Sequence, residues 1–234
     1  MVSIFLSTVL KIADLSHDVK LLRISVPNNF EFLAGQYVSI TIVDADGKKI
    51  RRPYSIASSP SKKGFIELCV KKVDGGLASN FIHNLKKGDI AEFLGPVGNF
   101  VINENSKNKD LIFVSTGTGI APFASMIPSL LENGFKNKII LISGFRFEEN
   151  ILYNDEFSRL KKRYGNFEFY NVLSRPKNES FENKGHVQNF LVKYIPENFD
   201  GHFYICGLSQ MVDGVKEKLN DLRIANEKIF FEKY

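Results

Sequence analysis

Hydrophobic and polar positions alternate in short runs over roughly the first hundred residues. Apolar side chains occupy every second position in Leu22–Val26 and Val38–Ile42, which is the period of a half-buried β-strand. Asp46-Gly47 is a hairpin signal between such runs, and Phe65–Val70 is a further apolar run. Short strands at this spacing predict a small antiparallel barrel, with a single helix near Leu77–Leu85.

The pattern of hydrophobic positions changes after residues 103–110, which are all polar. The expected strands beyond this segment are Leu111–Ser115, Lys138–Ser143, Phe167–Leu173, His202–Cys206 and Lys228–Glu232. The expected helices are Ala121–Glu132, Asn154–Arg163, Val187–Tyr194 and Gln210–Leu219. Strands that alternate with helices predict right-handed βαβ units in a parallel sheet. We therefore expect an α+β protein of two domains: an antiparallel six-stranded Greek-key β-barrel over residues 1–103, followed by an α/β doubly wound parallel sheet over residues 104–234.

Composition is that of a globular protein with real hydrophobic cores, since 44% of the 234 residues are hydrophobic and 24% are charged. The net charge of +5 is spread over scattered lysine doublets. It therefore predicts no nucleic-acid binding, and fits either a solvated surface or an acidic protein partner. No run approaches the roughly 18 apolar residues of a membrane span, and the N-terminal stretch lacks a basic region and a cleavage site. We expect a cytoplasmic protein that binds no membrane.

The cysteines and histidines predict no metal site. Cys69 and Cys206 are too far apart in sequence for any metal-ligand spacing. Two cysteines also cannot supply the four thiolates of an iron–sulfur cluster within this chain. The four histidines show no ligand spacing, so we expect them to be structural or on the surface.

Arg52-Pro53-Tyr54-Ser55 places a cation, a planar aromatic ring and a hydroxyl in one extended segment. In a regular strand Arg52 and Tyr54 point to one side and Ser55 to the other. Pro53 cannot donate to a ladder, which favours an edge strand. A ligand that is anionic at one end and flat at the other, such as a flavin nucleotide, suits this segment. An ordinary edge strand with an exposed arginine is the alternative.

Glycine-rich segments mark the ends of several expected strands. Residues 75–79 (GGLAS) open the first expected helix, residues 116–122 (TGTGIAP) open the next, and Cys206-Gly207 ends a strand. Glycine lets a backbone approach an anion closely, and the first turn of a helix offers free N–H groups. Residues 75–79 fit either a phosphate contact or plain helix capping. Residues 95–100 (GPVGNF) are expected to form a structural turn without chemistry.

Together with the terminal residues 230–234 (FFEKY), these segments resemble the ferredoxin–NADP reductase family of flavoproteins over nearly the whole chain. The resemblance implies a bound FAD, with NADPH or NADH as the substrate. Arg52 would pair with the flavin phosphate, Tyr54 would pack on the isoalloxazine ring, and Ser55 would lie near its N5 atom. The residues implied in cofactor binding are Arg52, Pro53, Tyr54, Ser55, Gly75, Gly76, Leu77, Ala78, Ser79, Thr116, Gly117, Thr118, Gly119, Ser174, Arg175, Cys206, Gly207 and Tyr234.

The same resemblance implies catalytic roles for Ser55, Cys206, Glu232 and Tyr234. Cys206 would stand beside nicotinamide C4 and orient it, without acting as a nucleophile. Tyr234 would cover the outer face of the flavin and move aside for the nicotinamide. Glu232 would lie near the same place.

The sequence gives partial evidence on which pyridine nucleotide is preferred. Ser174-Arg175 follows an expected strand at the place where members of this family that use NADP hold the 2′-phosphate. His186 stands where a permanent charge often completes that pocket, and it is a weaker cation at neutral pH. This arrangement predicts a modest preference for NADPH. Arg175 as a solvated loop cation is the alternative.

The function implied is an NAD(P)H-dependent FAD reductase that passes electrons to a one-electron acceptor. The expected partner is ferredoxin, flavodoxin or another small acidic electron-transfer protein, and the expected state is a monomer. One alternative is an NAD(P)H:flavin reductase that releases free reduced flavin. Another is the reductase component of an oxygenase, although this chain has no fused iron–sulfur domain. A non-enzymatic subunit that uses the fold for binding or regulation is the rival from another class.

Overall fold

The structure is a computed structural model that describes residues 2–196 and 199–234. Its chain divides into two compact units. The first comprises Met1–Val101 with Ala121–Ser129, and the second comprises Ile102–Ile120 with Leu130–Tyr234. The division is discontinuous, because the first turns of one helix group with the first unit. The predicted single boundary between residues 103 and 104 stays a prediction.

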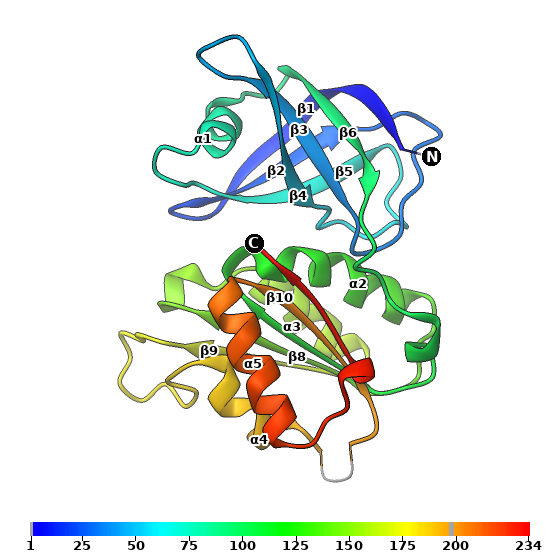
Figure 1. The fold of residues 1–234 in the computed structure, drawn as a ribbon, viewed down its shortest axis with the longest axis vertical. Helices are drawn as coiled ribbons and strands as arrows, with labels where there is room; N and C mark the ends of the chain where they lie inside the picture. The colour runs from blue at the N-terminus through cyan, green and yellow to red at the C-terminus, as the bar shows by residue number, and fades with distance from the viewer. Residues whose placement is uncertain (1, 197–198) are drawn as a thin grey trace. The chain divides into compact units, whose positions relative to one another are not determined.

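The first unit is built on a six-stranded antiparallel sheet with the strand order β4-β3-β6-β1-β2-β5 (Figure 1). The strands are β1 Ser3–Ser16, β2 Val19–Ser25, β3 Tyr37–Val43, β4 Lys49–Ser55, β5 Phe65–Lys71 and β6 Ile90–Val97, and the helix is α1 Leu77–Asn84. A bridge between Ile56 and Leu68 joins the two edges of the sheet. Alternate side chains such as Ile24, Ile40 and Phe93 are fully buried inside it. The expected antiparallel barrel with one helix is confirmed.

The second unit contains a five-stranded parallel sheet with the order β11-β10-β7-β8-β9 (Figure 1). Its strands are β7 Leu111–Thr116, β8 Ile139–Phe145, β9 Phe167–Leu173, β10 His202–Gly207 and β11 Ile229–Lys233. The helices that follow them are α2 Ala121–Glu132, α3 Asn154–Arg163, α4 Leu191–Tyr194 and α5 Ser209–Asp221. β8 is buried along its whole length, as expected for a strand covered on both faces. The doubly wound sheet is confirmed.

The expected helix over Val187–Tyr194 is only half α-helical. Val187–Phe190 forms a 3₁₀ turn, and the α-helix α4 covers Leu191–Tyr194 alone. A short 3₁₀ turn before an α-helix is common. Periodicity indicated the position of this element, and it did not distinguish the two helix types.

The polar segment 103–110 is more than a linker. Ser106 is fully buried, and its hydroxyl is 2.6 Å from His202 Nδ1 and 2.7 Å from the Tyr204 hydroxyl. The Asn103 N–H donates to the same Tyr204 oxygen at 2.8 Å. Buried polar side chains need such partners. A string of polar residues therefore completes the interior of the second unit.

Two features are absent from the part of the chain that the structure describes. No helix in residues 2–196 and 199–234 is both long and apolar enough to cross a membrane. Within the same residues, no group of three or more histidine, cysteine, aspartate or glutamate side chains is arranged to hold a metal ion.

Candidate functional site

β4 lies at the edge of the barrel sheet and pairs in the ladder with β3, as Pro53 predicted. Arg52 and Tyr54 are two residues apart and face the same side. The Tyr54 ring packs against the barrel core. Burial raises the pKa of Tyr54 to about 12, and the positive charge of Arg52 opposes this shift. The strand therefore holds a flat ring, supported from behind, beside a cation.

The polar groups of this strand remain available. Arg52 is exposed, and its Nη1 atom donates to the Arg51 carbonyl at 3.0 Å. Among the ion pairs of the described residues, none involves Arg52. Ser55 is half-buried at the end of the strand. A guanidinium and a hydroxyl thus lie before and after the ring along one strand.

The loop before α1 is held by its own side chains. Gly75 has a φ of +70°, and a Cβ on Gly76 would lie 2.7 Å from Ser79 Oγ. The Ser79 hydroxyl is buried, accepts from the Val73 N–H at 3.1 Å and donates to the Gly76 carbonyl at 3.2 Å. Ser79 therefore fixes the shape of the loop, and a phosphate contact from its hydroxyl stays a prediction.

The same loop leaves donors for an anion. Among the described residues no side chain caps α1, and no acidic residue occupies its first turn. The first N–H groups of a helix, here those of Leu77 and Ala78, have no partner within the helix. A negatively charged ligand is stabilised at such a terminus.

In the second unit, two glycine-containing segments interlock at the carboxyl ends of neighbouring strands. β7 and β10 run parallel, with Ser115 opposite Cys206. A Cβ on Gly119 would collide with the Cys206 carbonyl and lie 2.8 Å from Gly207 Cα. Gly207 has a φ of +147°, and a Cβ there would lie 2.6 Å from Thr116 Oγ1. The backbones meet this closely only because both positions are glycine.

Thr116 carries an unsatisfied polar atom at this crossing. Its Oγ1 is buried and has no hydrogen-bond partner among the residues that the structure describes. A buried hydroxyl without a partner costs free energy, and such groups in native folds call for an explanation. Ligands of doubly wound sheets bind at the carboxyl ends of the strands, where Thr116 lies. A bound nucleotide would supply the missing partner.

Cys206, Glu232 and Tyr234 come together at the same edge. Cys206 is fully buried and opposite Glu232 in the parallel register of β10 and β11. Burial strongly raises the pKa of the Cys206 thiol, a hydrogen bond with Tyr234 opposes this, and the Glu232 charge adds to the rise. Burial also raises the pKa of Glu232. The thiol is therefore neutral at pH 7, and a neutral thiol is a poor nucleophile.

The chain end is tied to this cluster. The Tyr234 N–H donates to the Gly207 carbonyl at 3.2 Å, and half of the Tyr234 residue surface is exposed. Backbone pairing thus fixes the last residue while its ring keeps an accessible face.

Ser174 and Arg175 follow β9, and their N–H groups donate to the last residue of β8 and to the residue after it. The Ser174 N–H donates to the Phe145 carbonyl at 3.0 Å, and the Arg175 N–H donates to the Arg146 carbonyl at 2.9 Å. Arg146 and Arg175 are both exposed. Sequence reasoning missed Arg146. The available signal was its place a few residues after the predicted strand Lys138–Ser143, at the same sheet edge as Arg175.

Glu148 anchors the loop that carries Arg175. Its carboxylate accepts hydrogen bonds from the N–H groups of Lys177 at 3.0 Å and Asn178 at 2.9 Å. These backbone bonds lower the pKa of Glu148, so the anchor is ionised at neutral pH. His186, the other predicted basic position, is exposed.

Comparison with known proteins matches each unit to a domain family. Residues 7–102 match the family model of the oxidoreductase FAD-binding domain, and residues 113–217 match that of the oxidoreductase NAD-binding domain. Ferredoxin–NADP reductase B of Sorangium cellulosum is 32% identical over 216 residues, which cover 88% of the chain and 86% of that protein. The chain belongs to the ferredoxin–NADP reductase family of flavoproteins, and it consists of an FAD-binding and an NAD(P)-binding domain.

Other relatives are longer than this chain. The reductase component DmpP of phenol 2-monooxygenase from Pseudomonas sp. (strain CF600) is 36% identical over 230 residues, which cover 95% of the chain and 63% of that protein. The crystal structure of the Amycolatopsis cytochrome P450 reductase GcoB matches with a TM-score of 0.90 at 25% identity, covering 99% of the chain and 70% of that protein. The chain therefore spans less than two thirds of DmpP.

Proposed function

We propose that this chain is an NAD(P)H-dependent FAD reductase that passes electrons to a one-electron acceptor protein. The observation that supports this most is the crossing of Gly119 with Cys206 and Gly207, beside the partnerless Thr116 hydroxyl, in the domain that binds NAD(P). When bound, FAD accepts a hydride from the nicotinamide and can release electrons one at a time. The residues hold, orient and shield the two cofactors.

On the first unit, we assign FAD to β4 and to the loop before α1. The exposed Arg52 fork suits bidentate binding of a phosphate. The Tyr54 ring offers a stacking face that the barrel core supports, and Pro53 keeps this edge free of a further strand. Ser55 would donate a hydrogen bond to flavin N5. The backbone N–H groups of residues 75–79 suit the second phosphate.

On the second unit, we assign the dinucleotide to the loop of residues 116–119. Its backbone would hold the pyrophosphate, and the Thr116 hydroxyl would gain a partner. The neutral Cys206 thiol would form an apolar wall for the nicotinamide, and Tyr234 would cover the ring that the nicotinamide must reach. Glu232 would remain beside the thiol as a charge that opposes its ionisation. No general base is required for a hydride transfer.

Arg175, with Ser174 assisting, is proposed to recognise the 2′-phosphate of NADPH. Arg146 supports this assignment, because its carbonyl bonds to the Arg175 N–H and it adds a second exposed cation at the same edge. Two guanidinium groups at one edge suit a phosphate dianion.

The proposed acceptor is ferredoxin, flavodoxin or another small acidic electron carrier, which the net charge of +5 favours. A second candidate is an oxygenase component, because the relative at 36% identity is the reductase component of phenol 2-monooxygenase. We propose that the protein acts as a monomer in the cytoplasm, where its two cysteines would stay reduced.

A visible absorption spectrum of the purified protein tests the proposal. A yellow protein that keeps its flavin through gel filtration, bleaches under anaerobic NADPH and reduces cytochrome c only with added ferredoxin supports it. A colourless protein that reduces added riboflavin supports the free-flavin reductase instead. A protein that neither binds FAD nor oxidises NADPH contradicts every reductase assignment.

A further inference from the structure

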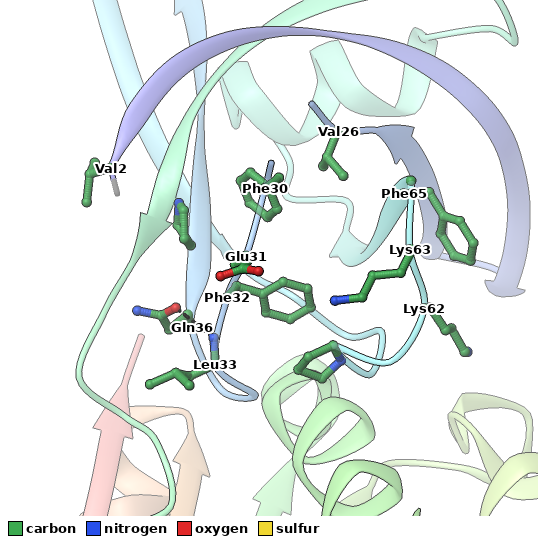
Figure 2. Close-up of a pocket in the computed structure, with 13 residues that line it drawn as sticks. Val2, Val26, Phe30, Glu31, Phe32, Leu33, Gln36, Lys62, Lys63 and Phe65 are labelled. Atoms are coloured by element: carbon green, nitrogen blue, oxygen red, sulfur yellow. Dashed lines mark hydrogen bonds between the residues drawn. The ribbon is translucent and has the colours of Figure 1, made fainter. Parts of the chain in front are cut away.

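The first unit has a pocket that the proposed FAD contacts leave unused. It has a volume of about 490 Å³, and neither residues 52–55 nor residues 75–79 line it. Its walls come from the end of β2, the segment 30–36 and the turn before β5 (Figure 2). All of these segments belong to the first unit.

One wall of the pocket is aromatic and rigidly backed. The Phe30 and Phe32 rings have centroids 6.0 Å apart, and Phe30 packs edge-on against Phe5 at 5.2 Å. Phe30, Phe32 and Val26 all pack against the barrel core. Phe30 and Phe32 are nevertheless only half-buried. A supported aromatic surface that remains accessible suits an aromatic ring, which gains both apolar burial and ring–ring contact.

The opposite wall carries positive charge. Lys63 and Phe32 extend toward one another from opposite walls (Figure 2), and none of the ion pairs of the described residues involves Lys63. The positive charge of Lys62 is partly compensated, since its Nζ is 3.9 Å from a Glu67 carboxylate oxygen. Glu31 is the acidic residue of the lining, so two lysines face one glutamate. The lining is net positive, and the exposed Lys63 extends toward the aromatic wall (Figure 2).

We propose that this pocket binds a small aromatic carboxylate, with its ring against Phe32 and Phe30 and its carboxylate at the Lys63 ammonium. The wall selects a planar apolar body, and the cation selects a negative charge on it. Glu31 opposes the same charge, and its effect on binding therefore has the opposite sign to that of Lys63.

The pocket is connected to the FAD strand through Gln36. The Gln36 carbonyl accepts from the Ile56 N–H at 2.9 Å, one residue after Ser55, and its side-chain amide donates to the Gly98 carbonyl at 3.2 Å. Gln36 also lines the pocket. We therefore expect ligand binding in the pocket to affect the end of β4, next to the predicted contact with the flavin N5 atom.

The test is a calorimetric titration of the FAD-loaded protein with benzoate, in the presence of saturating NADP⁺ so that the nucleotide site is filled. Benzoate is expected to bind with one saturable site, more tightly than benzyl alcohol or acetate. Lys63→Gln should weaken binding up to about five-fold, and Glu31→Gln should strengthen it by a similar factor, because exposed charge pairs have effects of this size. Phe32→Ala should weaken it about ten-fold.

Lys87→Gln is the matched control, because Lys87 is exposed and does not line the pocket. It should leave benzoate affinity unchanged. FAD content and thermal midpoint, measured for each variant, establish that it is folded. Folded Lys63→Gln and Phe32→Ala variants that bind benzoate like the wild type would overturn the proposal. Equal affinity for acetate and benzoate would do so as well.

Discussion

The two units prepare their candidate sites in opposite ways. On β4 the polar groups are presented outward from a barrel that is complete without them: Arg52 is exposed, and Ser55 ends the strand. At the carboxyl ends of β7 and β10, the backbones of Gly119, Cys206 and Gly207 are so close that a methyl group does not fit. The first site therefore depends on added functional groups, whereas the second depends on the packing itself. Substitutions should cost ligand binding in the first and both binding and stability in the second.

Gly119→Ala should have the largest effect. The added Cβ collides with the Cys206 carbonyl, and overpacking at backbone costs roughly 3 kcal/mol or more, which corresponds to a fall in Tm of roughly 6–12 °C. Oxidation of NADPH should be lost while the FAD-binding unit keeps its flavin. Gly165→Ala is the control, because nothing lies within 4 Å of the place that its added methyl group would take and its φ is not in the left-handed region. If Gly119→Ala and Gly165→Ala lowered Tm equally, the proposed difference between the two sites would be contradicted.

Arg52→Ala should weaken FAD binding without affecting stability. Loss of one charge-assisted contact with phosphate costs roughly 1.5–3 kcal/mol, or about ten- to a hundred-fold in affinity. Fluorescence titration of the apoprotein with FAD measures this. Arg51→Ala is the matched control, because Arg51 is the neighbouring arginine on the other face of the strand, 3.4 Å from Thr41 Oγ1. A loss of similar size in both variants would mean that general surface charge holds the flavin.

Arg175→Ala should lower kcat/KM for NADPH by about ten- to a hundred-fold, and leave NADH nearly unchanged. The wild type should prefer NADPH modestly. Steady-state kinetics with both nucleotides measure this, with Arg159→Ala on the exposed surface of α3 as the control. Equal losses for both nucleotides would show that Arg175 only shapes its loop. A wild type that prefers NADH would refute the assignment outright.

Glu232→Gln should have the smallest effect, and it should depend on pH. Burial raises the folded-state pKa of Glu232, so the folded protein binds this proton more tightly than the unfolded chain does. The resulting stabilisation is present below the unfolded pKa and is lost as pH rises through the folded pKa. Glutamine mimics the protonated form, so the gain in Tm over the wild type should grow from pH 4 to pH 8. The exposed Glu227→Gln should show no such trend.

Much of the fold follows from the sequence because its periodic signals are strong. The predicted bounds of α2, α3 and β9 are those observed. The segment 103–110 was harder, because its composition hides the buried Ser106. Whether a polar residue is buried depends on a partner, here His202 and Tyr204, that is nearly a hundred residues away.

The candidate site was predictable where a residue type is tied to a backbone requirement. Gly119 and Gly207 are such positions, because close approach leaves no alternative to glycine. Ser79 was less predictable, since a hydroxyl can serve a ligand or its own loop, and here it bonds to its loop. The pocket at Phe32 carries no sequence pattern, and the signal for Arg146 was limited to its place after a predicted strand. Both features arise from the way in which separate segments meet.

The discontinuous division of the chain has a consequence for building chimaeras with relatives. A splice at residue 103 would take Ala121–Ser129 from the donor, although this stretch belongs to the first unit. Within it, the Ser125 hydroxyl donates to the Ser58 carbonyl at 2.7 Å, and both residues are buried. A donor that lacks a hydroxyl at this position would leave that carbonyl without its partner, three residues beyond Ser55. Exchange of the nucleotide-binding half therefore alters the flavin-binding half, unless the recipient keeps its own residues 121–129.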